Sequence, residues 1–123
     1  MPTSFRSLEI WQLAHSLSTK IYETTRLFPK EEQFGLINQM RRASVSVSAN
    51  IAESCGRYRM KDKVQLLIVA RGSIYEMRSH ASIALDLKYI AQSVFNEFDG
   101  QYELLLRKLN AFISTLRNSP HAN

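Results

Sequence analysis

The sequence predicts an all-α protein, an antiparallel up-and-down four-helix bundle. Apolar residues recur every three or four positions through almost the whole chain, which is the period of an amphipathic helix. The 123 residues include only three prolines and four glycines, so few positions would interrupt a helix. Long helices with short connections favour a bundle whose neighbours run in opposite directions. We expect one domain over residues 1–123, because this length can bury a core without disulfides or metal.

The first helix is expected over residues 7–27, with Ser4 or Ser7 as its cap. Phe28 precedes Pro29, and proline disfavours helical conformation in the residue before it, so the helix should end there. The apolar face of this segment comprises Ile10, Trp11, Ala14, Leu17, Ile21 and Phe28.

The second helix is expected over residues 30–55. Pro29 suits a helix start, Glu31 and Glu32 would lie in the first turn, and Gly56 would end the helix. Its apolar face comprises Leu36, Met40, Ala43, Val47, Ile51 and Ser54. These side chains become smaller along the helix, which predicts close approach to a neighbouring helix.

The third helix is expected over residues 60–91 and the fourth over residues 97–117, the latter capped by Asn96 or Ser93. Gly100 would lie in the first turn of the fourth helix, where glycine is unfavourable, so it argues against this boundary. The expected core stripe of the third is Leu67, Ala70, Ile74, Met77, Ala81 and Ala84, and that of the fourth is Leu104, Leu105, Leu109, Phe112, Ile113 and Leu116. A second stripe on the third helix comprises Val64, Ile68, Tyr75 and Tyr89. The combined arc is wider than one bundle interior needs, so we interpret this stripe as a subunit interface, with extra intramolecular core as the alternative.

Positive charge is concentrated in one segment. Residues 41–71 contain seven basic and two acidic residues, which equals the +5 net charge of the whole chain. Such a distribution favours a surface that faces a polyanion, and the alternative is an ordinary solvated junction. The candidate nucleic-acid-binding residues are Arg41, Arg57, Arg59, Lys61 and Lys63. Tyr58 lies among them, where its ring could stack on a base.

A polar stripe runs beside the predicted core face of the second helix and continues on the third. Its members are Arg42, Ser46, Asn50, Glu53, Ser73 and Glu76. We interpret it as a polar seam that fixes helix register, with Arg42 paired inside the protein rather than free for phosphate. Asn50 and Glu53 as catalytic residues are the alternative, but no nucleophile or base accompanies them, so we expect no catalytic site.

The sequence gives little support for a metal site, a membrane-spanning segment or an internal disulfide. His80 follows Glu76 by one helical turn, but the Glu-x-x-His motif of di-iron bundles does not occur, so we expect no metal and no cofactor. No uninterrupted apolar run approaches membrane-spanning length. The single cysteine, Cys55, cannot form an internal disulfide, which favours a reducing, cytoplasmic location.

Three segments carry a resemblance to a known family. They are Trp11 to Pro29 followed by Glu32-Gln33-Phe34-Gly35-Leu36; Gln39-Met40-Arg41-Arg42-Ala43 with Ser46 and Asn50-Ile51-Ala52-Glu53; and Ala70-Arg71-Gly72-Ser73-Ile74-Tyr75-Glu76. Together they resemble the four-helix-bundle intervening-sequence proteins, some of which are encoded in insertions within bacterial large-subunit ribosomal RNA genes. The chain departs from the family pattern at Ser54, where glycine is common.

The resemblance implies an antiparallel bundle that assembles into a ring, commonly a pentamer. It also implies kinship with the accessory variability protein of diversity-generating retroelements, which works with a reverse transcriptase and binds nucleic acid. We therefore expect a non-enzymatic homo-oligomer that binds the backbone of RNA or DNA with little sequence specificity. The alternative is a scaffold that binds a protein partner without nucleic acid.

Overall fold

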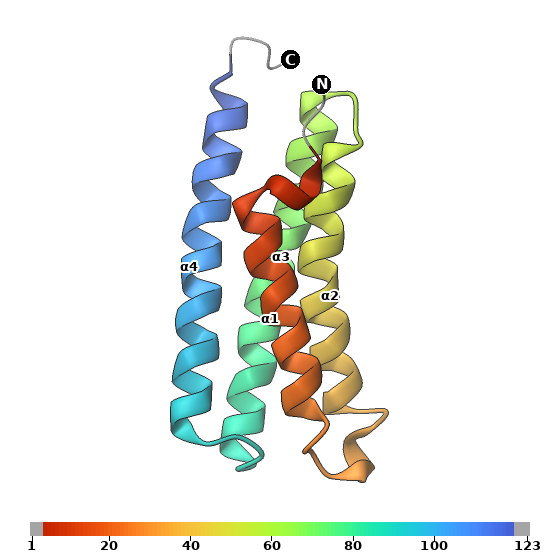
Figure 1. Ribbon diagram of the computed structural model, residues 1–123, viewed down its shortest axis with the longest axis vertical. Coiled ribbons are helices and arrows are strands. Elements are labelled where there is room, and N and C mark those ends of the chain that lie inside the picture. The colour runs from red at the N-terminus through yellow and green to blue at the C-terminus, as the bar shows by residue number, and fades with distance from the viewer. Residues whose placement is uncertain (1–3, 120–123) are drawn as a thin grey trace.

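The computed structural model describes residues 4–119, which form four long α-helices running alternately up and down (Figure 1). The helices are α1 (Glu9–Thr25), α2 (Leu36–Cys55), α3 (Met60–Asp86) and α4 (Gln92–Arg117), with short 3₁₀ helices η1 (Phe5–Ser7) and η2 (Lys30–Glu32). Contacts join α1 to α2, α2 to α3, α3 to α4 and α4 to α1, so each helix packs between two neighbours. The predicted fold class is confirmed.

The start of α2 lies later than predicted, at Leu36 rather than residue 30. Pro29 precedes only the short η2, after which the chain turns at Gly35. The Glu32 carboxylate accepts a hydrogen bond from the Leu36 backbone amide at 3.2 Å, so this acid caps α2 from outside the helix. At the N-terminus, Ser4 accepts from the Arg6 amide and caps η1, whereas α1 begins without a side-chain cap.

The connection between α3 and α4 also differs from the prediction. α3 ends at Asp86 rather than residue 91, because Lys88 adopts a left-handed conformation with φ of 62°. The amides of Lys88 and Tyr89 donate to the carbonyls of Leu85 and Ala84, which is the Schellman pattern that ends a helix. α4 then begins at Gln92 rather than residue 97.

The earlier start of α4 places Asn96 and Gly100 inside the helix, and neither Asn96 nor Ser93 caps it. Gly100 has no atom near the position that a Cβ would occupy, so the helix simply passes through it in open space. The helix start predicted at residue 97 is therefore wrong.

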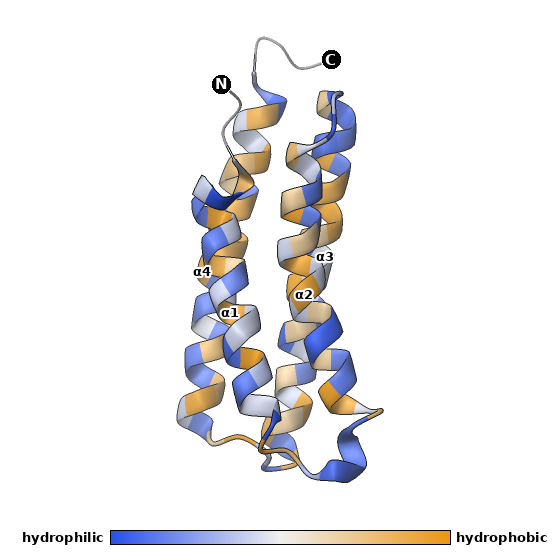
Figure 2. Cartoon of the chain, turned by 45° about the vertical axis from the view of Figure 1, so that its right-hand side comes forward, coloured by the Kyte–Doolittle hydropathy of each residue, from blue (hydrophilic) through white to orange (hydrophobic). Residues whose placement is uncertain are grey.

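The core follows the predicted apolar stripes closely. Every predicted core position of α2 and α3 is buried, as are those of the first segment except the partly buried Trp11. In α4 the prediction was less accurate, since Leu104, Phe112 and Leu116 are only partly buried while Phe98, Tyr102 and Leu106 are buried. In Figure 2 the apolar colour recurs along all four helices, whereas the α2–α3 turn and the η2 segment are hydrophilic.

Each neighbouring pair of helices is joined by at least one polar contact. These contacts include Ser18–Ser44 (α1–α2, 3.2 Å), Ser46–Ser73 (α2–α3, 2.8 Å), Arg78 with Asp99 and Glu103 (α3–α4, 2.9 and 2.7 Å) and Lys108–Glu9 (α4–α1, 2.6 Å). Polar contacts are directional, so they help to select one register among the many that an apolar interface would accept.

Candidate nucleic-acid interface

The turn between α2 and α3 presents its side chains to solvent. α2 ends where the Gly56 amide donates to the Glu53 carbonyl at 3.0 Å, and α3 begins after Arg59 in extended conformation. The side chains of Arg57, Tyr58, Arg59 and Lys61 are all exposed, and Tyr58 is 99% exposed. We call the segment from Arg57 to Lys63 the junction.

The four basic side chains of the junction differ in how firmly they are held. Lys63 donates from Nζ to the carbonyl oxygens of Ser54 (3.2 Å) and Cys55 (3.4 Å), where a positive charge stabilises the C-terminus of α2. Arg57 pairs with Glu53 at 2.6 Å, and both side chains are about half exposed. The side chains of Arg59 and Lys61 make no hydrogen bond or ion pair within residues 4–119, so they are the most available for a ligand.

Arg41 lies far from the junction, although it was predicted to act with it. Sixteen residues separate it from Arg57, which corresponds to roughly 24 Å of helix at 1.5 Å per residue. Its Nε donates to Thr25 Oγ1 at 2.9 Å, and its guanidinium lies 4.6 Å from the centre of the Tyr22 ring. Arg41 therefore joins α2 to the C-terminal end of α1.

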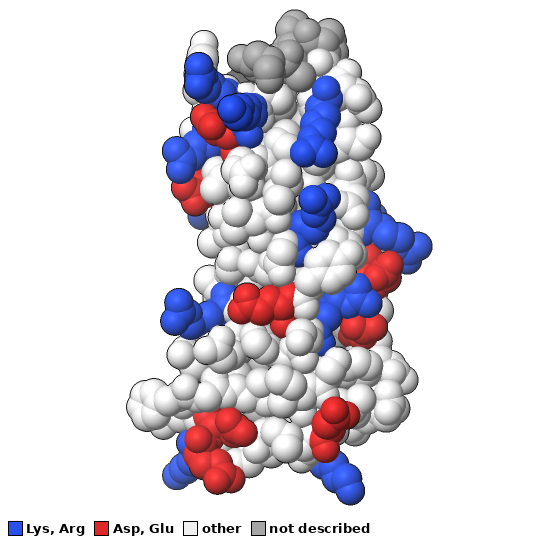
Figure 3. Space-filling view, turned by 180° about the vertical axis from the view of Figure 1, so that it is seen from behind, with Lys and Arg blue, Asp and Glu red and all other residues white. Residues whose placement is uncertain are grey.

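The fold brings further positive charge to the junction end. When the bundle is divided at the midpoints of its helices, the half that contains the junction comprises residues 4–16, 47–72 and 106–119, with nine basic and three acidic residues. The opposite half, residues 17–46 and 73–105, has seven basic and eight acidic residues. In Figure 3, Lys and Arg predominate in the upper part, whereas Asp and Glu mix with them lower down.

Five basic residues of this half were not among the candidates from the sequence. They are Arg6 beside α1, Arg71 on α3, and Arg107, Lys108 and Arg117 on α4. Because α4 is antiparallel to α3, its C-terminal half lies at the same end as the start of α3. The sequence shows the positive charges of the last helix. Only the topology of the bundle shows that they lie at the junction end.

The predicted polar seam forms in part. Ser46 and Ser73 share a hydrogen bond, and Asn50 Nδ2 donates to the Ser46 carbonyl at 2.8 Å and lies 3.1 Å from its hydroxyl. Arg42 and Glu76 lie on the rim of a hollow of about 300 Å³ beside these serines. Glu53 is exposed and pairs with Arg57 instead.

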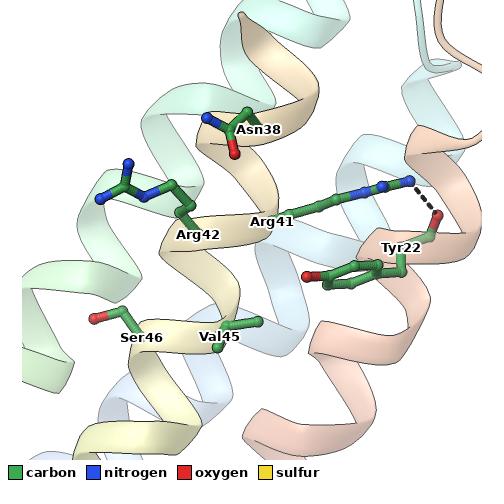
Figure 4. Close-up of a pocket in the computed structure, with 6 residues that line it drawn as sticks. All are labelled: Tyr22, Asn38, Arg41, Arg42, Val45 and Ser46. Carbon is green, nitrogen blue, oxygen red and sulfur yellow. Dashed lines mark hydrogen bonds between the residues drawn. The ribbon is translucent and has the colours of Figure 1, made fainter. Parts of the chain in front are cut away.

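Arg42 faces solvent rather than a partner inside the protein. Its side chain is exposed and makes no hydrogen bond or ion pair in the described part of the chain. It also borders a second hollow, of about 490 Å³, between α1 and α2, lined by Tyr22, Asn38, Arg41, Arg42, Val45 and Ser46. Figure 4 shows that Arg41 extends towards Tyr22 while Arg42 points away from it.

The residues predicted to form a subunit interface have different environments in the single chain. Val64 is buried in the core, and Ile68 is partly buried against it. Tyr89 donates its hydroxyl to Glu32 Oε2 at 2.8 Å, and this hydrogen bond raises the pKa of Tyr89. Tyr75 is 57% exposed, so it is the member of the stripe with most surface left for another subunit.

The described residues contain no cluster of three or more His, Cys, Asp or Glu side chains that could hold a metal ion. His80 Nε2 lies 3.4 Å from Glu76 Oε1, without the geometry of a hydrogen bond. None of the helices between residues 4 and 119 is both long and apolar enough to cross a membrane.

Comparisons with known proteins agree on the fold. A crystal structure of a protein of unknown function from the S23 ribosomal protein family of Bacteroides thetaiotaomicron superposes with a TM-score of 0.77 at 17% identity, covering 86% of this chain and 99% of that one. No curated protein gives a significant match. The family model of the 23S rRNA-intervening sequence protein matches residues 6–111. The chain therefore belongs to the 23S rRNA-intervening sequence protein family.

Proposed function

We propose that this protein is a non-enzymatic, oligomeric nucleic-acid-binding protein whose junction half contacts the phosphate backbone of RNA or DNA. The observation that carries the proposal is the difference in charge between the two halves of the bundle, nine basic against three acidic residues at one end and seven against eight at the other. A surface with such an excess attracts polyanions, and phosphate contacts supply affinity with little sequence specificity.

The basic side chains that are free to bind a ligand lie at the same end of the molecule. Arg59 and Lys61 are exposed and unpaired within the described residues, and Arg57 can exchange its half-exposed partner Glu53 for a phosphate at small cost. Arginine grips phosphate through two parallel N–H groups, whereas lysine adds a point charge. Arg41 and Lys63 contribute less, because each already binds main-chain or side-chain oxygen atoms of the bundle.

The test removes three charges at each end in turn. Arg57→Gln, Arg59→Gln and Lys61→Gln are combined in one variant, and Lys63 is kept because it stabilises the end of α2. The matched control combines Lys20→Gln, Arg26→Gln and Lys30→Gln, which are exposed residues of the opposite half. Fluorescence anisotropy measures the binding of labelled RNA and DNA of arbitrary sequence from low to moderate salt.

The junction variant is expected to bind more weakly and to reduce the dependence of log affinity on log salt by about 0.7 to 0.9 for each phosphate that it no longer neutralises. The control should keep most of the wild-type affinity and slope. Equal reductions of affinity in both variants would mean that binding depends on the net charge of the protein and not on the junction. Absence of wild-type binding at about 50 mM salt, where backbone contacts are strong, would end the nucleic-acid proposal.

Assembly of several chains would multiply these contacts. α3 leaves Val69, Tyr75 and Ile83 between 44% and 57% exposed along its length, a surface that another subunit would cover. A ring, by the family resemblance a pentamer, would repeat the junction around one axis, so that weak individual contacts act together. Light scattering is expected to give a mass of about five times the 14.2 kDa chain, and a mass of one chain would contradict the ring.

A protein scaffold is the second candidate, and the hollow beside Arg42 favours it. Tyr22 and Val45 are partly exposed apolar residues there, and Arg42 offers an unpaired guanidinium to a carboxylate. A photoreactive residue placed at Val45 in cells should then crosslink to another protein, whereas the same residue at exposed Asn96 should not. A nuclease-sensitive adduct at Val45 would contradict the scaffold and support a nucleic-acid ligand.

A further inference from the structure

We propose that the nucleic acid held at the junction is single-stranded, and that the ring of Tyr58 stacks on an unpaired base. This inference rests on the proposed function, because it assigns the ligand class to the same surface. The proposal concerns the faces of bases, which RNA and DNA share, so it does not distinguish between the two.

Tyr58 differs from most other tyrosines of the chain in having no structural task. Its side chain is 99% exposed, and it makes no ring contact or hydrogen bond within residues 4–119. By contrast, Tyr89 binds Glu32, Tyr22 lies against the Arg41 guanidinium, and Tyr102 is buried in the core. Both faces of the Tyr58 ring are therefore open to a flat partner.

The surroundings of Tyr58 match what a single strand presents. Exposed Arg57 and Arg59 flank the ring in the sequence. The α2–α3 turn lies at one end of the bundle (Figure 1), and that end carries the excess of positive charge. Proteins that bind single strands combine such basic groups, which contact phosphates, with aromatic rings, which stack on bases. The two kinds of contact alternate along a strand, as the two kinds of residue alternate at residues 57–59.

A duplex would use the same charges but not the ring. Inside a double helix, neighbouring base pairs already cover both faces of each base, so an external aromatic ring reaches a base face only at an end or a gap. Basic residues alone would bind either form through the backbone. Tyr58 is therefore the residue whose contribution separates single-stranded from double-stranded ligands.

The experiment compares wild type with Tyr58→Ala, Tyr58→Trp and Phe34→Ala. The last is the matched control, an aromatic residue 87% exposed in the turn before α2, at the other end of the bundle. Each protein is titrated with a fluorescent-base single strand containing 2-aminopurine and with the duplex of the same sequence. Circular dichroism checks that the fully exposed position tolerates each change.

Tyr58→Ala is expected to weaken single-strand binding by about 5- to 150-fold, the effect of removing one base–aromatic stack. Duplex binding should change by less than about twofold, because backbone contacts remain. Tyr58→Trp should keep the single-strand affinity that Tyr58→Ala loses, since indole offers a larger stacking face. It should also quench the 2-aminopurine fluorescence as wild type does. Phe34→Ala should resemble wild type in the binding of both ligands, because this ring lies far from the junction.

Several results would overturn the inference. They are a duplex bound as tightly as the single strand by wild type, equal weakening for both ligands in Tyr58→Ala, and no restoration by Tyr58→Trp. In each case, weaker binding by the variant that combines Arg57→Gln, Arg59→Gln and Lys61→Gln would leave the proposed function standing. If wild type binds neither ligand at low salt, the proposed function and this inference both fail.

Discussion

Replacing Ile51 with alanine is expected to lower the free energy of unfolding by about 2 to 5 kcal/mol. Ile51 is 0% exposed and belongs to the apolar core on α2. The substitution removes buried methyl and methylene groups and leaves a cavity that the surrounding helices fill only in part. Urea denaturation followed by the helical circular dichroism signal measures the decrease, at equal protein concentration because assembly would add to apparent stability.

The matched control is Leu27→Ala, which removes a similarly sized side chain from a position 86% exposed. Its free energy of unfolding should stay within about 0.5 kcal/mol of wild type, because the leucine side chain is already in water in the folded protein. Equal decreases at the two positions would mean that Ile51 is not buried as the bundle requires. The comparison therefore tests the inward face of α2 directly.

The inward faces were predictable because they depend only on the helical period. The positions of Met40, Val47 and Ile51 recur at intervals that place them on one side of α2 wherever that helix begins. Helix ends depend on single residues and were predicted less well. Pro29 with two following acids imitates a helix start, yet Glu32 caps the helix from outside.

The end of α3 had no recognisable signal in the sequence. Left-handed residues at helix ends are usually glycine, but here Lys88 takes that conformation. Nothing in the identity of a lysine indicates this conformation. The next residue, Tyr89, packs against Phe28 and donates a hydrogen bond to Glu32. That hydrogen bond joins residues 57 positions apart, so only the tertiary structure reveals it.

The candidate interface could be predicted where its residues adjoin in sequence. Arg57, Tyr58 and Arg59 lie together in both sequence and space, whereas Lys108 and Arg117 reach the same end only through the topology of α4. Whether a basic residue is free also depends on neighbours from other helices. The two consecutive arginines near the start of α2 differ for this reason, since Arg41 binds Thr25 of α1 whereas Arg42 faces solvent.

Replacing Ser73 with leucine is expected to lower the free energy of unfolding by about 1 to 3 kcal/mol through overpacking. The hydroxyls of Ser46 and Ser73 are 2.8 Å apart, and serine side chains are short, so the backbones of α2 and α3 must approach closely at this point. Ala43 and Ala70, also buried, have side chains of similarly small size. A leucine at position 73 would push α2 and α3 apart unless it turned into the hollow beside the serines, where its apolar side chain would meet Arg42 and Glu76.

Two controls separate overpacking from other effects of this change. Ser73→Ala removes the hydroxyl without adding volume, and Ser46 keeps its contact with Asn50, so the decrease should be at most about 1 kcal/mol. Ser16→Leu adds the same volume at an exposed position of α1 and should change stability by less than about 0.5 kcal/mol. If Ser73→Leu were as stable as Ser16→Leu, the two helices would have room for a large side chain, and the small residues on their facing sides would need an explanation other than close packing.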